Sequence, residues 1–417
     1  MANFSYALKL SQDGDDLANL NVADPRLFRD GATSPFFARL RREAPVHYCP
    51  ESAFGPYWSV TRYADIQAIE LDTVRFSSDH RLGGIALAGE PEDRFNFPMF
   101  IALDPPEHGI KRKTVEPMFT RSHVARLGDR IRANSAQLLD ALPIGETFDW
   151  VDRVSNPLTA MTLAILFDFP MAEIAKLTHW SRIITAIPGG PVVASEDAKM
   201  AEMNLCFARF AELWQDKVGA SPAPDLLWSL ANDPENRHLS QAEFCGLISL
   251  MLVAATDTTR NTISGSIFAL DRHPDQYRLL REDHGHIRGM MAETLRWHSP
   301  VAHMRRTATC DLELGGQHIR RGDKLALWYI SGNHDEAAFP GAGAYDITRD
   351  DARRHLSFGH GIHRCVGAPL AELQMTILWE EILKRFPQIE VCAEPVRSFS
   401  VFMHGFEALH ARIPHRL

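Results

Sequence analysis

Cysteine is scarce in this chain, and no two cysteines stand close enough to form a C-x-x-C pair. The six cysteines are spread over 417 residues, at Cys49, Cys206, Cys245, Cys310, Cys365 and Cys392. Disulfide frameworks and zinc modules group their cysteines at short spacing. The sequence therefore predicts free thiols in a reducing compartment, which favours a cytoplasmic protein.

A long apolar run is also missing from the start of the chain. Residues 1–15 read MANFSYALKLSQDGD. They lack the basic and then apolar order of a signal peptide and the roughly 20 apolar residues that a membrane span needs. We therefore expect no membrane anchor. The net charge of −9 disfavours a nucleic-acid partner.

Nothing in the composition divides the chain into parts. We find no Pro/Ser-rich linker, internal repeat or low-complexity block, so residues 1–417 are predicted to form a single domain. A chain of this length exceeds the usual size of one core and is large enough to enclose a cofactor.

The pattern of apolar residues indicates a mainly α fold with small β-sheets (α+β). Residues 45–49 and 56–61 read as two short strands joined by a turn at Gly55, and residues 312–319 read as a hairpin with a Gly-Gly turn. From about residue 105 to 300 the dominant period is helical. Helices are therefore expected to form most of the molecule.

The most informative segment is residues 358–367, FGHGIHRCVG. It places Cys365 on a glycine-containing loop that leads into a predicted helix, and the positive end of a helix favours a thiolate held against a metal. Gly361 and Gly367 would allow tight turns and close approach to a flat ligand. Two alternatives stay open: an inert buried thiol, or a zinc site made of His360, His363 and Cys365, although no second cluster completes a tetrahedral set.

A long helix is predicted to begin at the capping box Ser240-Gln-Ala-Glu243 and to end before His273-Pro274. Such a helix would be about 45 Å long and would cross the molecule. Its apolar run is interrupted by the polar segment 256–261, TDTTRN. Burying unpaired polar groups costs about 1–3 kcal/mol each, so these groups are expected to serve a function rather than to lie in solvent.

These segments resemble motifs of the cytochrome P450 family of monooxygenases. Residues 358–367 match F-x-x-G-x-H-x-C-x-G, residues 254–259 match the oxygen-side motif, and Glu293 and Arg296 match E-x-x-R. The resemblance implies a haem between the long helix and the helix after the cysteine. Its cofactor would be haem b (iron protoporphyrin IX), with Cys365 as the axial ligand of the iron and Phe358 and Gly367 beside it.

The resemblance also assigns roles to the other motif residues. Splitting dioxygen requires two protons, which Asp257 and Thr258 would relay. Ala255 departs from the glycine that is usual in the family and would narrow the space beside oxygen. Glu293 and Arg296 would form a structural ion pair, with Arg349 as a candidate third partner. The haem carboxylates would be held by His108, Arg112, Arg306 and His363.

The function implied is insertion of one oxygen atom of O2 into an unactivated C–H bond of a small apolar substrate. No flavin or nicotinamide site is visible, so electrons would come from an iron–sulfur ferredoxin with a separate ferredoxin reductase. A basic patch on the cysteine side of the haem would dock it, with a solvated charged face as the alternative. The patch residues are Lys111, Arg112, Lys113, Arg353, Arg354 and Arg364.

Several C-terminal segments look like the bacterial branch that hydroxylates alkanes and fatty-acid chains at the terminal carbon. We therefore expect medium-chain alkanes or fatty-acid-like chains as substrates, with terpenoid or steroid side chains as the alternative. A haem sensor or a peroxygenase would not need Asp257 and Thr258. The predicted pocket residues, each of which could instead be ordinary core, are Leu87, Phe100, Ile187, Val192, Leu252, Ala255, Val301, Met304 and Phe402.

Overall fold

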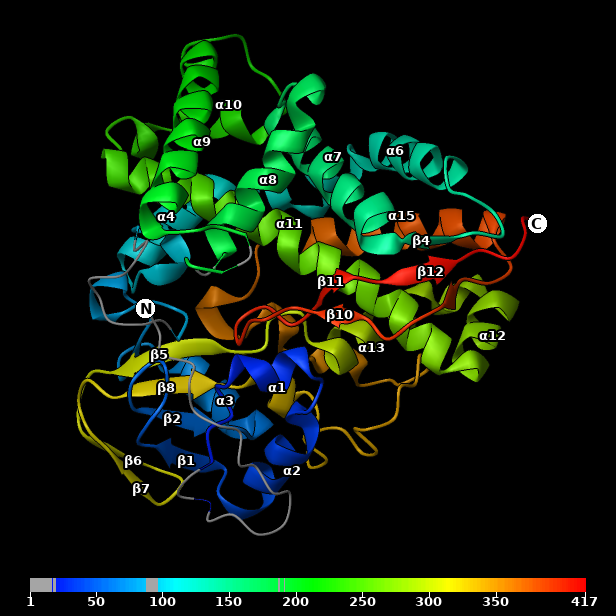
Figure 1. Ribbon diagram of the computed structural model, residues 1–417. Coiled ribbons are helices and arrows are strands. Elements are labelled where there is room, and N and C mark those ends of the chain that lie inside the picture. The colour runs from blue at the N-terminus through cyan, green and yellow to red at the C-terminus, as the bar shows by residue number, and fades with distance from the viewer. Residues whose placement is uncertain (1–16, 18–19, 88–96, 187, 191) are drawn as a thin grey trace.

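Helices form most of the molecule, as predicted (Figure 1). This computed structural model describes residues 17, 20–87, 97–186, 188–190 and 192–417. The α-helices are α1 Pro25–Arg29, α2 Thr33–Glu43, α3 Tyr63–Leu71, α4 Glu107–Val115, α5 Arg121–Ala125, α6 Gly128–Asp140, α7 Asn156–Phe167, α8 Ile174–Thr185, α9 Glu196–Lys217, α10 Leu226–Asn232, α11 Gln241–Arg272, α12 Pro274–Glu282, α13 Ile287–His298, α14 Tyr329–Gly332 and α15 Ala368–Arg385.

The strands are short and form four small sheets in the described part of the chain. They are β1 Val46–Cys49, β2 Tyr57–Val60, β3 Phe76–Ser77, β4 Thr147–Asp149, β5 Met304–Ala308, β6 Leu312–Leu314, β7 Gln317–Ile319, β8 Lys324–Leu327, β9 Glu390–Val391, β10 Val396–Arg397, β11 Phe406–Ala408 and β12 His410–Arg412. The largest sheet has the order β1-β2-β8-β5-β3, with β2 and β8 parallel and the other pairs antiparallel.

Both predicted hairpins are confirmed. Strands β1 and β2 pair antiparallel, and so do β6 and β7, which Gly315 and Gly316 connect. Both glycines have positive φ, of 57° and 76°, which is the backbone region that a tight hairpin turn needs and that glycine adopts without strain. The parallel pairing of β2 with β8 joins segments that are distant in the sequence.

Helix α11 runs through the centre of the helical part, as Figure 1 shows. The capping box is present, since Ser240 and Glu243 each accept a hydrogen bond from the other's backbone N–H. The helix ends before His273, where Pro274 begins α12. By length and composition alone, this helix could cross a membrane. Its burial among other helices accounts for that hydropathy.

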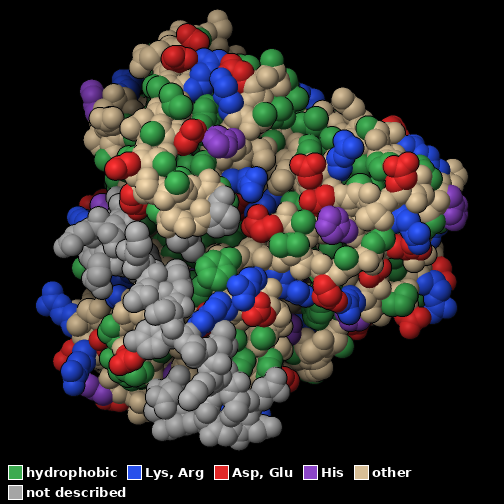
Figure 2. Space-filling view, viewed as in Figure 1, with side chains coloured by type: hydrophobic (Ala, Val, Ile, Leu, Met, Phe, Trp, Pro, Cys, Tyr) green, Lys and Arg blue, Asp and Glu red, His purple; other side chains and the backbone are tan. Residues whose placement is uncertain are grey.

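The two ends of α11 belong to different cores. Its first half, with Ile248 and Leu252, packs in a cluster that includes α7, α8, α9 and α10. Its second half, with Ile263 and Leu270, packs in a cluster with α13 and α15. The polar segment 256–261 therefore lies in the interior between two apolar clusters. On the surface shown in Figure 2, acidic and basic side chains are interspersed over the helical part.

Candidate active site

The loop from Phe358 to Gly367 holds the cysteine in a closed turn ahead of α15. The backbone N–H of Cys365 donates to the carbonyl oxygen of Phe358 at 2.7 Å. Gly361 has φ of +63°, and a Cβ there would lie 2.6 Å from the carbonyl oxygen of Glu70 at the end of α3. Only glycine fits this position. Gly367 has φ of −80°, so its backbone has no need of glycine's freedom.

The Cys365 side chain is exposed, and the space that it faces is an internal cavity. Burial within the protein raises the pKa of this thiol, while the backbone N–H groups of Gly367 and Ala368 and the charges of Arg112 and Arg364 lower it. The groups that favour a thiolate are therefore the start of α15 and two arginines.

The cavity is lined by residues from the cysteine loop, α4, α11, β5 and α15. Twelve of the predicted catalytic, haem-binding and substrate-pocket residues line it, namely Phe100, His108, Arg112, Ala255, Thr258, Val301, Met304, Arg306, Phe358, His363, Cys365 and Gly367. The structure therefore brings the cysteine loop, the alcohol of α11 and the four expected carboxylate-binding side chains to one space.

Four of the remaining predicted pocket residues do not line this cavity, and the fifth is not described by the structure. Leu252 is fully buried in the core on another side of α11, and neither it nor Leu87 nor Phe402 lines this cavity. Val192 is 39% exposed and does not line it either. Ile187 lies outside the described residues. An α-helix turns about 100° per residue, so residues that follow one another, such as Met251 and Leu252, face different directions.

One edge of the cavity carries buried nitrogen atoms that have no partner in the described protein. These are both ring nitrogens of His363 and Nε2 of His108, and the two rings lie 4.4 Å apart. Burial lowers the pKa of His108 to about 4 and that of His363 to about 2, so both rings are neutral at neutral pH and can each donate one N–H.

Two arginines stand at the same edge. Arg112 donates from Nε to Glu116 (2.6 Å) and from Nη1 to the carbonyl oxygen of Ile362 in the cysteine loop (3.1 Å). Arg306 is 3% exposed and donates from Nη2 to Glu70 at 3.2 Å. Unsatisfied buried donors beside guanidinium groups fit the two carboxylates of a haem whose iron faces Cys365.

Asp257 and Thr258 occupy different faces of α11. Thr258 lines the cavity, and its hydroxyl donates to the carbonyl oxygen of Ala254 at 2.9 Å. Asp257 is 3% exposed and does not line the cavity. Arg260 lies 3.6 Å from it. Burial raises the pKa of Asp257, and Arg260 opposes that shift.

Helix α8 supplies the other partners of Asp257. Ser181 donates to Oδ1 at 3.3 Å, and Thr185 donates to Oδ2 at 3.2 Å. Ser181 is buried, whereas Thr185 is exposed. The hydroxyls of Thr185 and Ser181 thus connect the surface to the buried carboxyl group of Asp257. Asp257 directly precedes Thr258, which lines the cavity. No sequence signal marked these two residues, because they pair with Asp257 only across the α8–α11 contact.

Glu293 and Arg296 of α13 are both fully buried and form a bidentate pair with two contacts of 2.7 Å. Arg296 also donates to the carbonyl oxygens of Asn333, Ala342 and Ala344. Every nitrogen of this guanidinium therefore has a partner. Breaking such a buried pair typically costs about 3–5 kcal/mol.

The structure places Arg349 beside this pair. Its Nε lies 3.4 Å from Glu293, and its Nη atoms donate to the carbonyl oxygens of Pro340 and Gly341. Asn333 ties the same region to the cysteine loop, because it donates to Ser357 (3.0 Å) and accepts from the backbone N–H of Leu356 (2.6 Å). Sequence reasoning gave no role to Asn333.

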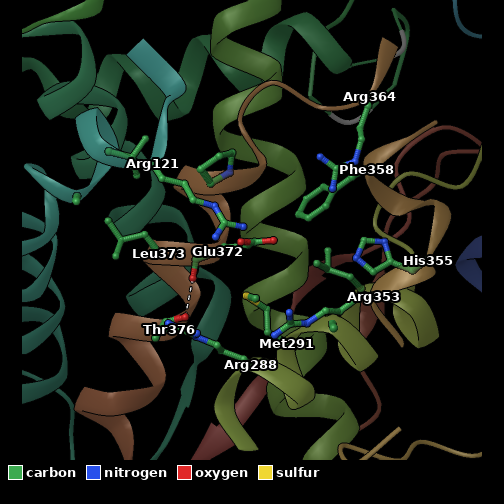
Figure 3. Close-up of a pocket in the computed structure, with 15 residues that line it drawn as sticks. Arg121, Arg288, Met291, Arg353, His355, Phe358, Arg364, Glu372, Leu373 and Thr376 are labelled. Carbon is green, nitrogen blue, oxygen red and sulfur yellow. Dashed lines mark hydrogen bonds between the residues drawn. The ribbon is translucent and has the colours of Figure 1, made fainter. Parts of the chain in front are cut away.

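A second pocket, of about 380 Å³, lies on the other side of the cysteine loop (Figure 3). It shares Met291, Leu295, Phe358 and Arg364 with the first cavity. Four arginines line it, from α5, α13 and the segment 353–364: Arg121, Arg288, Arg353 and Arg364. None of these four forms an ion pair with another residue in the described ranges. Glu372 of α15 is the acidic side chain among them.

Only two of the six residues of the predicted basic patch therefore line this pocket. Arg353 and Arg364 line the pocket, and Arg121 and Arg288 were missed. Lys111 lies 3.3 Å from Glu243. Arg354 stacks over the ring of Tyr63 at 5.7 Å. Lys113 is exposed but is not among the residues lining this pocket.

Within the described ranges, no group of three or more His, Cys, Asp or Glu side chains is arranged to hold a metal ion. The single cysteine facing the cavity, with carboxylate-binding groups at its edge, is the donor set of a haem-thiolate site. The model of the family described as "Cytochrome P450" matches residues 220–398.

Similarity to known proteins extends over almost the whole chain. Linalool 8-monooxygenase of Pseudomonas putida is 35% identical over 94% of this chain and 98% of its own. The methyl-branched lipid omega-hydroxylase of Mycobacterium tuberculosis (strain H37Rv) is 31% identical, over 91% and 90%. The solved structure of CYP153D17 from Sphingomonas sp. PAMC 26605 is 45% identical, with a TM-score of 0.86 over 94% of this chain and 98% of that one.

The chain belongs to the cytochrome P450 family. It has the cytochrome P450 fold, it is a monooxygenase, and its cofactor is haem b. When bound, the haem supplies the chemistry that activates O2. Cys365 would ligate the haem, and the side chains at the cavity edge would orient it.

Proposed function

We propose that this monooxygenase hydroxylates the terminal carbon of medium-chain alkanes or fatty-acid-like chains. The observation that supports this proposal most directly is the composition of the cavity lining. Its charged residues are Arg112, Arg306 and Arg364, and no acidic side chain from the described residues lines it. Arg112 and Arg306 are assigned to the haem carboxylates, and Arg364 is shared with the arginine pocket.

The rest of the lining is mostly apolar. It includes Ile85, Phe100, Leu250, Met251, Val301 and Met304. Such a lining offers little to a polar or charged substrate and gains free energy by taking a hydrocarbon out of water, at about 25 cal/mol per Å² of buried apolar surface. A peroxygenase with a cation reserved for a substrate carboxylate fits this lining less well.

A terpenoid substrate is the alternative that a specific observation favours. The relative that is 35% identical is a linalool monooxygenase. The relative named as an omega-hydroxylase acts on a methyl-branched lipid. Both names describe oxidation of apolar molecules, and they differ in the shape of the molecule. Chain shape is therefore the property that an experiment has to vary.

A titration of the haem absorption spectrum tests the substrate class. We expect n-octane and octanoate to shift the purified protein from low to high spin, because an apolar chain that fills the cavity displaces water from beside the iron. Cyclooctane, with the same number of carbons, controls for hydrophobicity alone. Linalool and a sterol test the alternative. A shift with the cyclic compounds and none with the linear ones would contradict the terminal-hydroxylase proposal.

Asp257 and Thr258 are proposed to move protons in this reaction. Thr258 lines the cavity, and Asp257 accepts hydrogen bonds from the hydroxyls of Ser181 and the exposed Thr185. Burial raises the pKa of Asp257, which favours the protonated form that a proton relay needs. Water would reach Asp257 from the side of α8 without entering the apolar cavity.

The proposed electron donor is a small acidic ferredoxin, which a separate reductase reduces. The enzyme itself is proposed to be a single domain (residues 1–417) located in the cytoplasm. The support is the pocket of four arginines without ion-pair partners directly behind the cysteine loop (Figure 3). An electropositive hollow attracts an acidic partner and brings it close to the haem.

Reversing charge in this pocket tests the docking proposal. We expect Arg288→Glu to raise the KM for ferredoxin on the order of tenfold at low salt, and the difference from the wild type to shrink as salt is added. The matched control is Arg153→Glu, which reverses the same charge at an exposed position outside this pocket. Equal effects of the two substitutions would show that only net charge matters.

A further inference from the structure

Glu70 is a buried carboxyl group to which no sequence motif drew attention. It lies in the last turn of α3, next to the buried Ile69, and is 1% exposed. The carbonyl oxygen of the same residue lies against Gly361 of the cysteine loop. A carboxyl group in such a place needs partners, because burying an uncompensated charge is costly.

Its partners are residues of the haem carboxylate edge. Oε1 of Glu70 accepts hydrogen bonds from Nη2 of Arg306 at 3.2 Å and from the hydroxyl of Tyr329. Oε2 has no partner among the described residues. Arg306 is held on its other side as well, since Nη1 donates to the carbonyl oxygen of Arg305 at 2.9 Å. Arg306 and Tyr329 both line the cavity that Cys365 faces.

This arrangement puts an extra carboxyl group where the protein has to bind two others. Burial raises the pKa of Glu70, whereas the charge of Arg306 and the hydrogen bond from Tyr329 oppose that shift and favour the charged form. The cations at this edge are Arg112 and Arg306, and each already has a carboxylate partner, Glu116 and Glu70. The two partners differ in exposure: the side chain of Glu116 is 47% exposed and that of Glu70 is 0% exposed. Water screens the first strongly and the second weakly.

We propose that Glu70 is a positioning residue that fixes Arg306 and whose buried charge opposes the haem carboxylate that Arg306 faces. This rests on the proposed assignment of Arg306 to the haem. Two consequences follow. The charge weakens haem retention, and it favours the oxidised iron over the reduced iron, because a nearby negative charge stabilises the more positive state. Glu70 thus sets how readily this enzyme accepts its first electron.

The test compares three variants of the haem-loaded full chain by two measurements. Glu70→Gln keeps the size of the side chain and an oxygen that can accept from Arg306 and Tyr329, and removes only the charge. We expect the midpoint potential to rise and the transfer of haem to apomyoglobin to slow on the order of tenfold, which corresponds to about 1.4 kcal/mol. Glu70→Asp keeps the charge, and its potential should stay close to that of the wild type.

Glu116→Gln is the matched control, since it removes the same charge beside the other arginine of the edge. Because Glu116 is exposed, removing its charge should change the rate of haem transfer by less than about twofold. It should also move the midpoint potential less than Glu70→Gln does. Three results would overturn the proposal: wild-type behaviour of Glu70→Gln, faster haem loss from it, or equal effects of Glu70→Gln and Glu116→Gln. A midpoint potential of Glu70→Asp that is raised as far as that of Glu70→Gln would overturn it too. Failure of the substrate proposal would leave these measurements unaffected.

Discussion

Replacing Cys365 by serine is expected to abolish both the thiolate-type absorption spectrum of the haem protein and its monooxygenase activity. The metal would take the thiolate form of the cysteine, which the N–H groups of Gly367 and Ala368 and the charges of Arg112 and Arg364 favour. A serine hydroxyl at the same position stays protonated and donates far less electron density to the iron. The absorption of the reduced, carbon-monoxide-treated protein and product analysis measure the two losses.

The chain offers good controls for this substitution. Cys310 and Cys392 are also exposed and free, and neither lines the cavity. Cys310→Ser and Cys392→Ser should leave the spectrum and the activity as in the wild type. A thiolate-type spectrum that persists in Cys365→Ser would mean that another cysteine ligates the iron, and the proposed site would then be wrong.

Replacing Thr258 by alanine is expected to lower product formation by about 100-fold, while the consumption of O2 and reducing equivalents continues. General acid–base groups contribute roughly 10²–10⁴-fold in rate, and Thr258 is the residue of the Asp257–Thr258 pair that lines the cavity. Electrons and protons that do not produce hydroxylated product would leave as hydrogen peroxide. The ratio of product to O2 consumed measures this uncoupling.

Two further variants separate proton delivery from packing. Thr258→Ser keeps the hydroxyl and should restore most of the coupling. Thr262→Ala removes a hydroxyl one turn further along α11, which also lines the cavity and donates to a helix carbonyl at 2.8 Å. We expect Thr262→Ala to remain coupled. Full coupling in Thr258→Ala, or equal uncoupling in Thr262→Ala, would contradict the role of Thr258.

The parts of the site that lie close together in the sequence could be predicted from it. The cysteine loop is ten consecutive residues, so its hydrogen bond from Cys365 to Phe358 and its position before α15 follow from local spacing. Helix α11 carries its own start and stop signals, and its polar segment stands out within an apolar run. The i, i+3 spacing of Glu293 and Arg296 likewise placed the two charges on one face.

The parts built from distant segments could not be predicted in this way. Glu70 and Arg306 are 236 residues apart, and Thr185 and Asp257 are 72 residues apart. Nothing local to Glu70 distinguishes it from an exposed glutamate on a helix. Arg121 and Arg288 were missed for the same reason, because only the packing of α5 and α13 around the cysteine loop brings them to one pocket.

The pocket prediction shows where the resemblance reached its limit. At about 100° per residue, Met251, Ala255, Thr258 and Thr262 share one face of α11, and all four line the cavity. Leu252 was assigned to the pocket by family position and lies about 100° from Met251, in the core. The direction of each side chain depends on how the helix is rotated against its neighbours.

The sequence by itself determined the chemistry and the class of this protein: a single cysteine on a loop before a helix, an acid–alcohol pair inside a long apolar helix, and a mainly α fold. These features are local, and local spacing and propensity control them. Only the tertiary structure decided which charges meet at the haem edge, how Asp257 reaches the surface and which side chains line the cavity. Those contacts form between segments that chain packing alone brings together.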